Sequence, residues 1–447
     1  MAEEQKRIVV VGGGFAGVDA AKRLRRELPE TWEIVLYNRE NHLCFSPLLP
    51  EVVGASLNPL HVVWSIREMA PGVVCRTTAV TAFDFEAAEI EYLDGTGLPR
   101  RDRYDHLVLA VGLPVRLEII EGMAEHGWPI KTLGDAAALR NHLIAQLERA
   151  EVTEDPQARA ELLSVAIVGG GFTGVEVAGA VLDLFQASVP YYSTITASDC
   201  QVHLLDGGPR ILGPLPSSLS DVARKSLSDR GMKIREGVGV EAVERSGVRL
   251  AGGDSVAAGT VVSAVGNGTH PLIAGSGLVL ERGRVVVAGD LRVEGRENIW
   301  ALGDCAGVPN AFDDSISPTL AQHAMQQARL LSDNLIATIH GKPTSLFSYE
   351  PKGMFCVIGH RNAVGRIYGR NISGLLAWLL WHAVYWAKMP TFARKVQVAV
   401  DWLWDACFPR DIAELSMEQT QEIEAKHGKA ASSVSSKNPS AELHPDG

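Results

Sequence analysis

Two glycine-rich turns are the parts of this chain whose residue types and spacing could do chemistry. Both have the pattern GxGxxG, formed by Gly12, Gly14 and Gly17 in one turn and by Gly169, Gly171 and Gly174 in the other. The first glycine of such a turn permits a tight bend, the second lets backbone approach a pyrophosphate, and the third packs a helix against a strand. The N-terminus of the helix that follows adds positive potential. Each turn therefore predicts a bound dinucleotide.

Each turn must be positioned by a strand before it and a helix after it. The first lies between the strand RIVVV at 7–11 and the helical pattern VDAAKRLRREL, and the strand WEIVLYN follows. The second belongs to SVAIVGGGFTGVEVAGAVLDLF at 164–185, followed by the strand QVHLLD at 201–206. Units of this kind have parallel strands and right-handed connections. The repeat predicts an α/β protein with two Rossmann-like dinucleotide-binding domains.

Later segments complete the predicted domains. YDHLVLAVG at 104–112 and TVVSAVG at 260–266 read as matching late strands, and NIWALGDCAG at 298–307 reads as a return to the first domain. We therefore expect a discontinuous first domain (1–120 and 295–345), a second domain (121–294) and a C-terminal region (346–412). The segment 413–447 is poor in apolar residues and is predicted to be disordered.

The residue that ends the second strand of each unit differs between the copies. Asp206 ends QVHLLD, and a carboxylate there accepts hydrogen bonds from ribose hydroxyls and repels a 2′-phosphate, which favours NADH over NADPH. Arg210 lies close enough in sequence to weaken that preference. The first copy has the uncharged Asn38 instead, and Glu40 is an alternative ribose ligand.

Composition excludes several classes of protein. The chain has 447 residues and a net charge of -11, which argues against nucleic acid as a partner. Its six cysteines are scattered with no CxxC pair, which disfavours a disulfide framework and a zinc site, and no metal is predicted. The N-terminus runs from charged residues directly into a strand, so we expect no signal peptide and a cytoplasmic protein.

A tryptophan-rich run, GLLAWLLWHAVYW at 374–386, is the most apolar segment near the C-terminus. It is shorter than the ~20 residues that a membrane span needs. Residues 351–400 contain seven Lys or Arg and no Asp or Glu, so the rest of the chain carries -11 - 7 = -18. A basic, Trp-rich patch is typical of a segment that lies on an anionic membrane surface, whereas a buried core helix is the alternative.

Taken together, the first glycine turn, YDHLVLAVG, GGGFTGVEVAG and ALGDCAG resemble the flavoproteins with two dinucleotide-binding domains, the family that includes disulfide reductases. Within that family, NHLCFSPLLPEV, SPTLAQHAMQQA and the Trp-rich C-terminus look like type II NADH dehydrogenases, which are NADH:quinone oxidoreductases that do not pump protons. The resemblance covers about residues 7–412 and implies FAD in the first domain and NADH in the second. It implies a respiratory, peripheral protein on the cytoplasmic face of the cell membrane, with a membrane quinone as acceptor. The oligomeric state, a homodimer included, stays open.

The resemblance also implies which residues bind the cofactors. For FAD these are Gly12, Gly13, Gly14, Phe15, Ala16, Gly17, Asn38, Arg39, Val80, Ala110, Gly112, Asp304 and Ala321. For NADH they are Gly169, Gly171, Phe172, Thr173, Gly174, Glu176, Asp206 and Gly266. Asp304 matches the family aspartate that binds the flavin ribityl chain.

Four residues are expected near the reacting groups. Glu176 matches a family glutamate near the nicotinamide and flavin, Gln322 and Gln326 would flank the quinone site, and Lys388 would lie near the quinone head group. Ser317 and Pro318 predict a helix start, with Ser317 as N-cap, whose dipole would stabilise negative charge on the flavin. His323 is treated as structural, because a lone helical histidine more often is.

Three alternatives have different requirements. A dithiol–disulfide oxidoreductase needs a CxxxxC beside the flavin, and Cys44 has no such partner. A sulfide:quinone oxidoreductase needs two cysteines near the flavin, of which Cys356 is one candidate. A non-enzymatic, membrane-bound NADH sensor would keep both cofactors and lack the quinone pocket.

Overall fold

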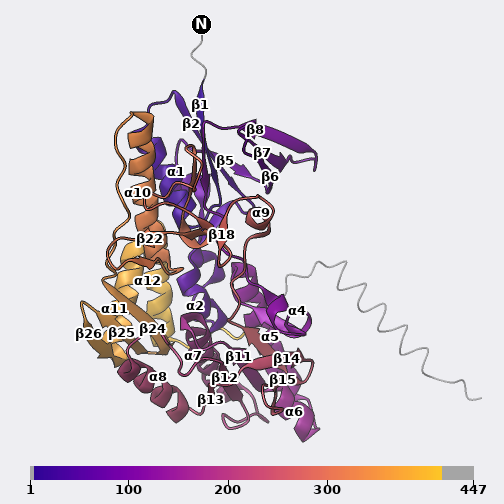
Figure 1. Cartoon of the computed structure of the whole chain (residues 1–447). Helices are drawn as coiled ribbons and strands as arrows, with labels where there is room; N and C mark the ends of the chain where they lie inside the picture. The colour runs from indigo at the N-terminus through magenta and orange to yellow at the C-terminus, as the bar shows by residue number, and fades with distance from the viewer. Residues whose placement is uncertain (1–4, 415–447) are drawn as a thin grey trace, which may run out of the picture. The chain divides into compact units, whose positions relative to one another are not determined.

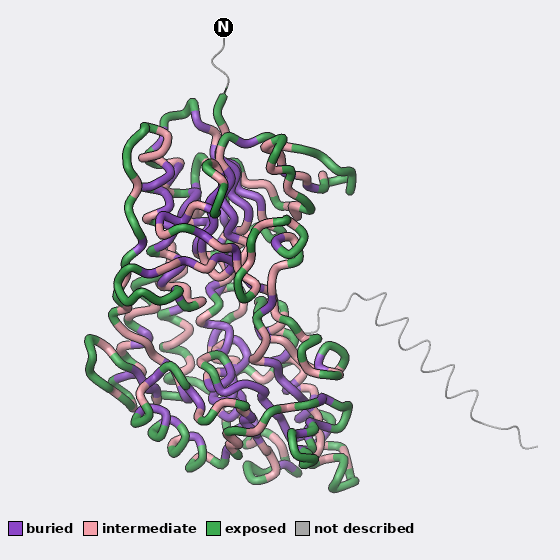
Figure 2. The backbone as a smooth tube through the Cα atoms, viewed as in Figure 1, coloured by how far each residue is buried: buried purple, intermediate pink, exposed green. Residues whose placement is uncertain are grey.

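The structure is a computed structural model that describes residues 5–414. The predicted disordered tail lies almost wholly outside the described residues. Two five-stranded sheets form the core of residues 5–411, and their inner strands are mostly buried, whereas some edge strands are partly exposed (Figure 2). Both sheets are parallel throughout, as predicted for doubly wound domains.

The first sheet has the order β20-β9-β1-β2-β5. Its strands are β1 (Lys6–Val11), β2 (Trp32–Asn38), β5 (Val74–Thr77), β9 (His106–Leu109) and β20 (Ile299–Ala301). Helix α1 (Phe15–Glu27) connects β1 to β2 and buries its alanine and leucine face. Because β20 pairs with β9, the chain does return to the first sheet after completing the second, as the sequence predicts.

The second sheet repeats this arrangement, with the order β10-β17-β11-β12-β13. Its strands are β10 (Gly127–Pro129), β11 (Ser164–Val168), β12 (Gln201–Asp206), β13 (Lys233–Glu236) and β17 (Thr260–Ser263). Helix α7 (Phe172–Ser188) takes the place of α1, while α5 (Leu133–Glu151), α6 (Pro156–Leu162) and α8 (Ser217–Asp229) complete this part of the chain. All five residues of β11 are buried, which explains its continuous apolar run.

Each copy also carries a three-stranded antiparallel sheet. One consists of β6 (Val80–Asp84), β7 (Glu89–Leu93) and β8 (Pro99–Arg103), and the other of β14 (Val240–Glu244), β15 (Gly247–Leu250) and β16 (Ser255–Ala257). The repeat detected in the glycine turns therefore extends over most of both units.

The C-terminal region is a small antiparallel sheet followed by two helices. The sheet contains β24 (Gly353–Gly359), β25 (Asn362–Ile367) and β26 (Arg370–Ser373), and the helices are α11 (Gly374–Lys388) and α12 (Phe392–Cys407). Figure 1 shows them in orange and yellow beside α2 (Leu49–Val53) and α7. Within residues 5–414, Phe172–Tyr191 is the one helical segment long and apolar enough to cross a membrane, and 61% of its most apolar window is buried, as in a core helix.

Helix α7 contacts this C-terminal sheet at very short range. A Cβ atom added at Gly179 would lie 2.8 Å from the carbonyl carbon of Ile358 and 3.0 Å from the nitrogen of Gly359. Real Cβ atoms do not approach backbone so closely, so a side chain here must push α7 and β24 apart.

We predict that Gly179→Val destabilises the protein by about 2 kcal/mol or more, because overpacking against backbone cannot be relieved by a rotamer change. Denaturant unfolding of the purified protein measures the effect. Gly213→Val is the matched control, since a Cβ there meets nothing within 4 Å. Equal stability of the two variants would contradict the close contact.

Candidate active site

The first glycine turn has the geometry that a pyrophosphate requires. Gly12 has φ +114, and a Cβ there would lie 2.2 Å from the Ala110 carbonyl oxygen. A Cβ at Gly17 would lie 1.9 Å from the Gly12 oxygen, so only glycine permits this packing of α1 on β1. A Cβ at Gly14 meets nothing within 4 Å, which leaves open space at the N-terminus of α1. That helix has no side-chain cap, so its first N–H groups face this space.

The second turn repeats the geometry almost residue for residue. Gly169 has φ +113, a Cβ at Gly174 would lie 1.8 Å from the Gly169 oxygen, and a Cβ at Gly171 meets nothing within 4 Å. Helix α7 likewise has no side-chain cap. Both turns are therefore bent, tightly packed and open at the same three positions, as two dinucleotide sites require.

The residues that end β2 and β12 both hold their glycine turn. Asn38 Oδ1 accepts a hydrogen bond from the Gly13 amide at 2.8 Å, and Asp206 Oδ1 accepts one from the Gly170 amide at 3.1 Å. The Asn38 amide nitrogen also donates to the Glu40 carbonyl oxygen. Asp206 thus keeps its second oxygen for a ligand, whereas both ends of the Asn38 side chain are engaged. The Arg210 guanidinium donates to the Gly213 carbonyl.

Asp304 lies in the short turn after β20, beside α10 (Ala321–Ile339). The neighbouring Gly303 amide donates to Gln327 Oε1 at 2.8 Å, which joins the turn to the helix. Burial raises the pKa of the Asp304 carboxyl, against the charges of Lys131 and Arg284. Within the described part of the chain Asp304 has no hydrogen-bond partner, so its carboxylate is available to a bound group.

The predicted start of this helix is wrong. Helix α10 begins at Ala321 with Leu320 at the N-cap and no side-chain cap, and Ser317 lies outside it. The reason is that Ser315–Ile316 pairs with Pro309–Asn310, and the Ser317 amide then donates to the Val308 carbonyl. Hydrogen bonding to the hairpin therefore outweighs the capping preference of serine, and the uncapped N–H groups belong to Ala321 and Gln322.

The other predicted FAD ligands are spread along the first domain. Val80 begins β6, Arg39 is exposed after β2, and Ala110 and Gly112 follow β9. Ala16 is buried in α1, while the Phe15 ring contacts Phe45 with centroids 5.3 Å apart. Phe45 in turn contacts Tyr385 of α11 at 5.9 Å, so an aromatic chain links the first glycine turn to the C-terminal region.

The remaining predicted residues lie on several elements: some open α7 beside the second turn, and others lie on α10 and α11. Phe172 and Thr173 open α7, and Gly266, with φ +84, packs its backbone against Arg116. Gln322 is partly buried in the first turn of α10, whereas Gln326 is exposed and Gln327 beside it is buried. Lys388 is the last residue of α11, where desolvation lowers the pKa of its ammonium.

Glu176 is partly buried on α7, which packs against both α2 and β24. Its Oε1 accepts a hydrogen bond from the Val357 amide at 3.3 Å. Burial raises the pKa of Glu176 to about 8, and the nearby charge of Glu51 adds to that rise. At neutral pH its carboxyl therefore holds a proton, which makes it a candidate acid.

Three side chains escaped the sequence analysis: Glu51 and Tyr385, which interact electrostatically with Glu176, and His382, which contacts Glu51. Glu51 lies in α2, and His382 and Tyr385 lie in α11 within the Trp-rich run. His382 Nε2 lies 3.5 Å from Glu51 Oε1, and burial raises the pKa of Tyr385 well above its ordinary value. A lone glutamate in an apolar segment and a lone histidine between tryptophans carry no motif, so the available signal was only their polarity in apolar surroundings.

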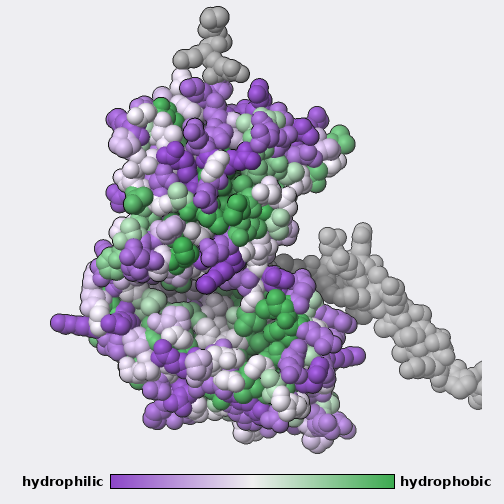
Figure 3. Space-filling view, viewed as in Figure 1, coloured by the Kyte–Doolittle hydropathy of each residue, from purple (hydrophilic) through white to green (hydrophobic). Residues whose placement is uncertain are grey.

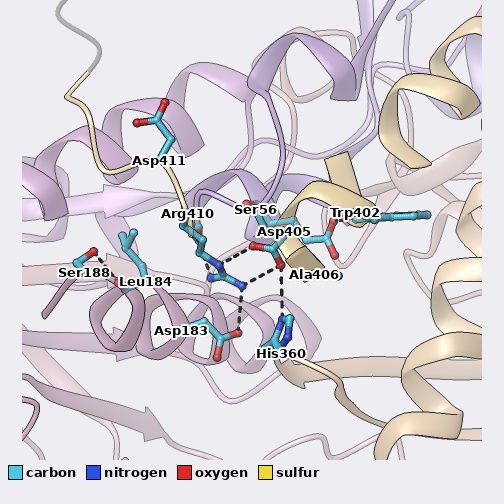
Figure 4. Close-up of polar contacts among 12 residues, drawn as sticks. Ser56, Asp183, Leu184, Ser188, His360, Trp402, Asp405, Ala406, Arg410 and Asp411 are labelled. Atoms are coloured by element: carbon cyan, nitrogen blue, oxygen red, sulfur yellow. Dashed lines mark hydrogen bonds and ion pairs between the residues drawn. The ribbon is translucent and has the colours of Figure 1, made fainter. Parts of the chain in front are cut away.

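A buried ionic cluster ties the end of α12 to α7 and α2. Arg410 pairs with Asp405 at 2.9 Å, approaches Asp183 of α7 at 3.9 Å and donates to the Gly54 carbonyl at 2.9 Å. Figure 4 shows Asp405 between Arg410 and His360, with Asp183 on the other side of the guanidinium. The cluster thus holds α7, the end of α2 and the segment after α12 in fixed positions relative to one another.

Comparison with known proteins agrees with this geometry. Residues 6–328 match the family model described as pyridine nucleotide-disulphide oxidoreductase, and residues 352–411 match the NDH2 C-terminal domain. The chain is 30% identical over 418 residues to the type II NADH:quinone oxidoreductase Ndh of Mycobacterium tuberculosis, covering 89% of this chain and 87% of that one. It is 31% identical over 412 residues to the demethylphylloquinone reductase NdbB of Synechocystis, covering 90% and 97%.

Solved structures share the fold. NDH2 of Plasmodium falciparum in complex with NADH superposes with a TM-score of 0.85 at 19% identity, covering 92% of this chain and all of that one. The sulfide:quinone oxidoreductase of Aquifex aeolicus has a TM-score of 0.67 at 17% identity, covering 94% and 95%.

The two glycine turns on two parallel sheets define a flavoprotein with two dinucleotide-binding domains. Within that class, the chain belongs to the type II NADH:quinone oxidoreductase family, because it matches both the reductase and the C-terminal family models and has relatives at 30% identity or more over most of its length.

We predict that Asp206→Asn lowers the preference for NADH over NADPH. Asparagine keeps the acceptor for the Gly170 amide, as Asn38 does in the first copy, but removes the charge that repels a 2′-phosphate. The ratio of the two dissociation constants should fall about tenfold, equivalent to about 1.4 kcal/mol. Nucleotide titration followed by protein fluorescence measures it. Asp229→Asn, an exposed change paired only with Lys225, is the control and should leave the ratio unchanged.

We also predict a pH-dependent effect of Glu176→Gln on stability. A carboxyl whose pKa is raised on folding keeps its proton in the folded state while the unfolded chain has released it. It therefore costs stability progressively as pH rises from the ordinary carboxyl pKa of 4.5 towards 8, and each pKa unit between the unfolded and folded states corresponds to about 1.4 kcal/mol. Thermal unfolding at pH 5 and pH 8 measures the difference in stability between the variant and the wild type. This difference should shift in favour of the variant at pH 8. The exposed control Glu154→Gln should show no such gain. A gain that does not depend on pH would contradict a buried neutral Glu176.

Proposed function

We propose that this chain oxidises NADH and reduces a membrane quinone through bound FAD, without pumping protons. The observation that carries the proposal is the pair of open glycine turns, one on each parallel sheet. Glu176, which follows the second turn on α7 and holds a proton at neutral pH, adds to it. The relatives named as NADH:quinone oxidoreductase and demethylphylloquinone reductase support the same activity. We also propose the domain boundaries that the sequence predicts, with FAD bound by residues 1–120 and 295–345, NADH by 121–294, and the membrane contacted by 346–412.

Bound FAD supplies hydride acceptance from NADH and two-electron donation to the quinone. The residues that would hold it are those of the first turn, with Asp304 towards its polar chain and the uncapped start of α10 towards its ring. Asn38 supports the turn, and the exposed Glu40 is placed to accept from the ribose. The second turn and Asp206 would orient NADH.

The quinone would bind near Glu176, Gln322 and Lys388, with Gln326 at the rim. Glu176 holds a proton near neutral pH and can deliver it to a quinone oxygen, since the acceptor gains protons as well as electrons. Cys356, a candidate for sulfide chemistry, is completely buried, its thiol packs against the Phe172 carbonyl, and burial raises its pKa well above the ordinary value. These features favour quinone reduction over sulfide oxidation, because the thiolate is the reactive form.

The two C-terminal helices present the surface proposed to lie on a membrane. Along α12 an exposed apolar stripe recurs every fourth residue, and α11 exposes leucines in its first two turns. These residues are Phe392, Val396, Val400, Leu403 and Trp404 on α12 and Leu375, Leu376 and Leu379 on α11. The opposite face of α12 is anchored to the protein by Asp401, Trp402 and Asp405.

Tryptophan contributes less to this surface than its sequence position suggests. Trp381 is 1% exposed and Trp378 and Trp402 are half-buried, while Trp386 and Trp404 reach the surface. Lys395 lies over the Trp386 ring at 5.4 Å and, with Arg394 and Lys388, puts positive charge beside the stripe. On the face shown in Figure 3, other apolar side chains gather in separate patches among polar ones. We propose that this surface of α11 and α12 binds anionic lipid on the cytoplasmic face of the membrane. The proposal is compatible with a monomer or a homodimer.

The activity is tested by anaerobic reduction of the purified holoprotein with NADH, followed by a soluble menaquinone or ubiquinone analogue. We expect NADH to bleach the flavin absorbance and the quinone to restore it, with NADPH reacting more slowly. A flavin that stays oxidised in NADH would overturn the proposal. A flavin that NADH bleaches but no quinone restores would point to the sensor alternative instead.

Membrane binding is tested with the triple variant Leu379→Ser, Phe392→Ser and Leu403→Ser. Because these side chains are exposed, the fold should survive while binding to anionic vesicles falls about tenfold or more in a flotation assay. The control triple, Leu98→Ser, Val152→Ser and Val279→Ser, removes exposed apolar groups elsewhere. NADH should reduce the flavin of both variants normally. Undiminished vesicle binding by the first triple would refute this surface.

A further inference from the structure

His382 lies in a box of three tryptophan rings. The centroid of its imidazole is 3.8 Å from that of Trp378, 4.3 Å from Trp402 and 4.8 Å from Trp381. The first and last of these come from α11 and Trp402 from α12, so the box closes only when the two helices pack. The ring planes are inclined to the imidazole by 45°, 69° and 63°, so the three indoles fix its orientation.

The hydrogen bonds around His382 identify the atom that can exchange a proton. Its Nδ1 lies 2.9 Å from the Trp378 carbonyl oxygen, which only accepts, so Nδ1 carries a hydrogen. The other nitrogen, Nε2, faces Glu51 Oε1 at 3.5 Å. The Trp402 indole N–H donates to the second carboxylate oxygen, Oε2, at 2.8 Å. Nε2 and Oε1 thus lie within ion-pair distance of each other, with both side chains fixed by their other contacts.

Glu51 is the member of this pair that acts on Glu176. Helix α2, which carries Glu51, packs against α7, and the Glu51 charge is one cause of the raised pKa of Glu176. Glu176 in turn acts on Tyr385 of α11 and Cys356 of β24: burial, with the Glu176 charge adding to it, raises the pKa of both groups, so they stay protonated. About 9% of the His382 side chain and 14% of the Glu51 side chain is exposed, which allows exchange with water at the edge of the box.

We infer that Glu51 and His382 form a proton relay that returns a proton to Glu176 each time quinone is reduced, with the tryptophan box and the Trp402 N–H holding the relay in place. The inference rests on the proposed function. Glu51 and His382 act through Glu176 and are positioning and relay residues rather than groups that touch the acceptor.

The balance of the reaction requires such a supply. NADH gives up a hydride, which carries two electrons and one proton, whereas the quinone gains two electrons and two protons. The second proton passes from water to the Glu51–His382 pair, from the pair to the Glu176 carboxylate, and from Glu176 to a quinone oxygen. No further oxidant or reductant is needed.

The test compares two acceptors in the membrane-bound holoprotein. Ferricyanide takes one electron and no proton, whereas a quinone analogue takes both. In His382→Gln and Glu51→Gln we expect NADH:quinone turnover at pH 8 to fall about tenfold, with a smaller loss at pH 6 and with ferricyanide turnover within about twofold of the wild type. Added imidazole should partly restore quinone turnover in His382→Ala.

His61→Gln is the matched control. His61 pairs with Asp401 at 2.6 Å, so it also joins α12 to the rest of the protein through a histidine–carboxylate contact, but it lies outside the box. It should leave both activities unchanged. Equal losses with both acceptors in His382→Gln would show a structural role and overturn the relay, as would quinone turnover equal to the wild type.

Trp402→Phe is a milder variant if the others fold poorly. It keeps an aromatic ring but removes the N–H that donates to Glu51, so quinone turnover should fall while ferricyanide turnover is kept. Quinone turnover equal to the wild type would count against the relay. A wild type that reduces ferricyanide and no quinone overturns the proposed function itself, and the relay with it, whereas failure of the variants alone overturns only the relay.

Discussion

The close contact between α7 and β24 is the constraint on which the site depends. Helix α7 begins at the second glycine turn, carries Glu176 in its second turn, and at Gly179 packs so tightly on Ile358 that no side chain fits. Arg410 then joins Asp183, further along the same helix, to α12 and to the Gly54 carbonyl. One helix thereby sets the position of the nucleotide turn, the buried acid and the C-terminal helices together.

Burial of charge gives this region both its rigidity and its chemistry. Asp183 is almost fully buried and is matched by Arg230 and Arg410, so removing either partner would leave an uncompensated charge. Glu176 is partly buried, with a single amide donor and no basic partner among the described residues, and it keeps its proton instead. Low polarity around α7 therefore has two results. Asp183 is held by ion pairs with arginines, whereas Glu176, which has no such partner, keeps its proton.

Local patterns predicted most of the fold, because they depend on neighbouring residues. The strands and helices around both glycine turns and the return of β20 to the first sheet follow the sequence closely. The start of α10 did not, since Ser317 is recruited by hydrogen bonding in the Pro309–Ile316 hairpin. The tryptophans also divided differently from the prediction: three of them surround His382, and the exposed apolar stripe is mainly leucine, valine and phenylalanine.

The sequence by itself determined the family, the two nucleotide turns and the candidate ligands on them, because a strand, a glycine turn and a helix are contiguous and their spacing is the signal. It could not bring Glu51, Glu176 and His382 together, since these lie on three helices far apart in the chain and none belongs to a motif with the others. Whether a carboxyl is charged depends on how much water and which charges surround it after packing. Only the tertiary structure decided that Glu176 holds a proton and that a histidine surrounded by tryptophans lies against Glu51.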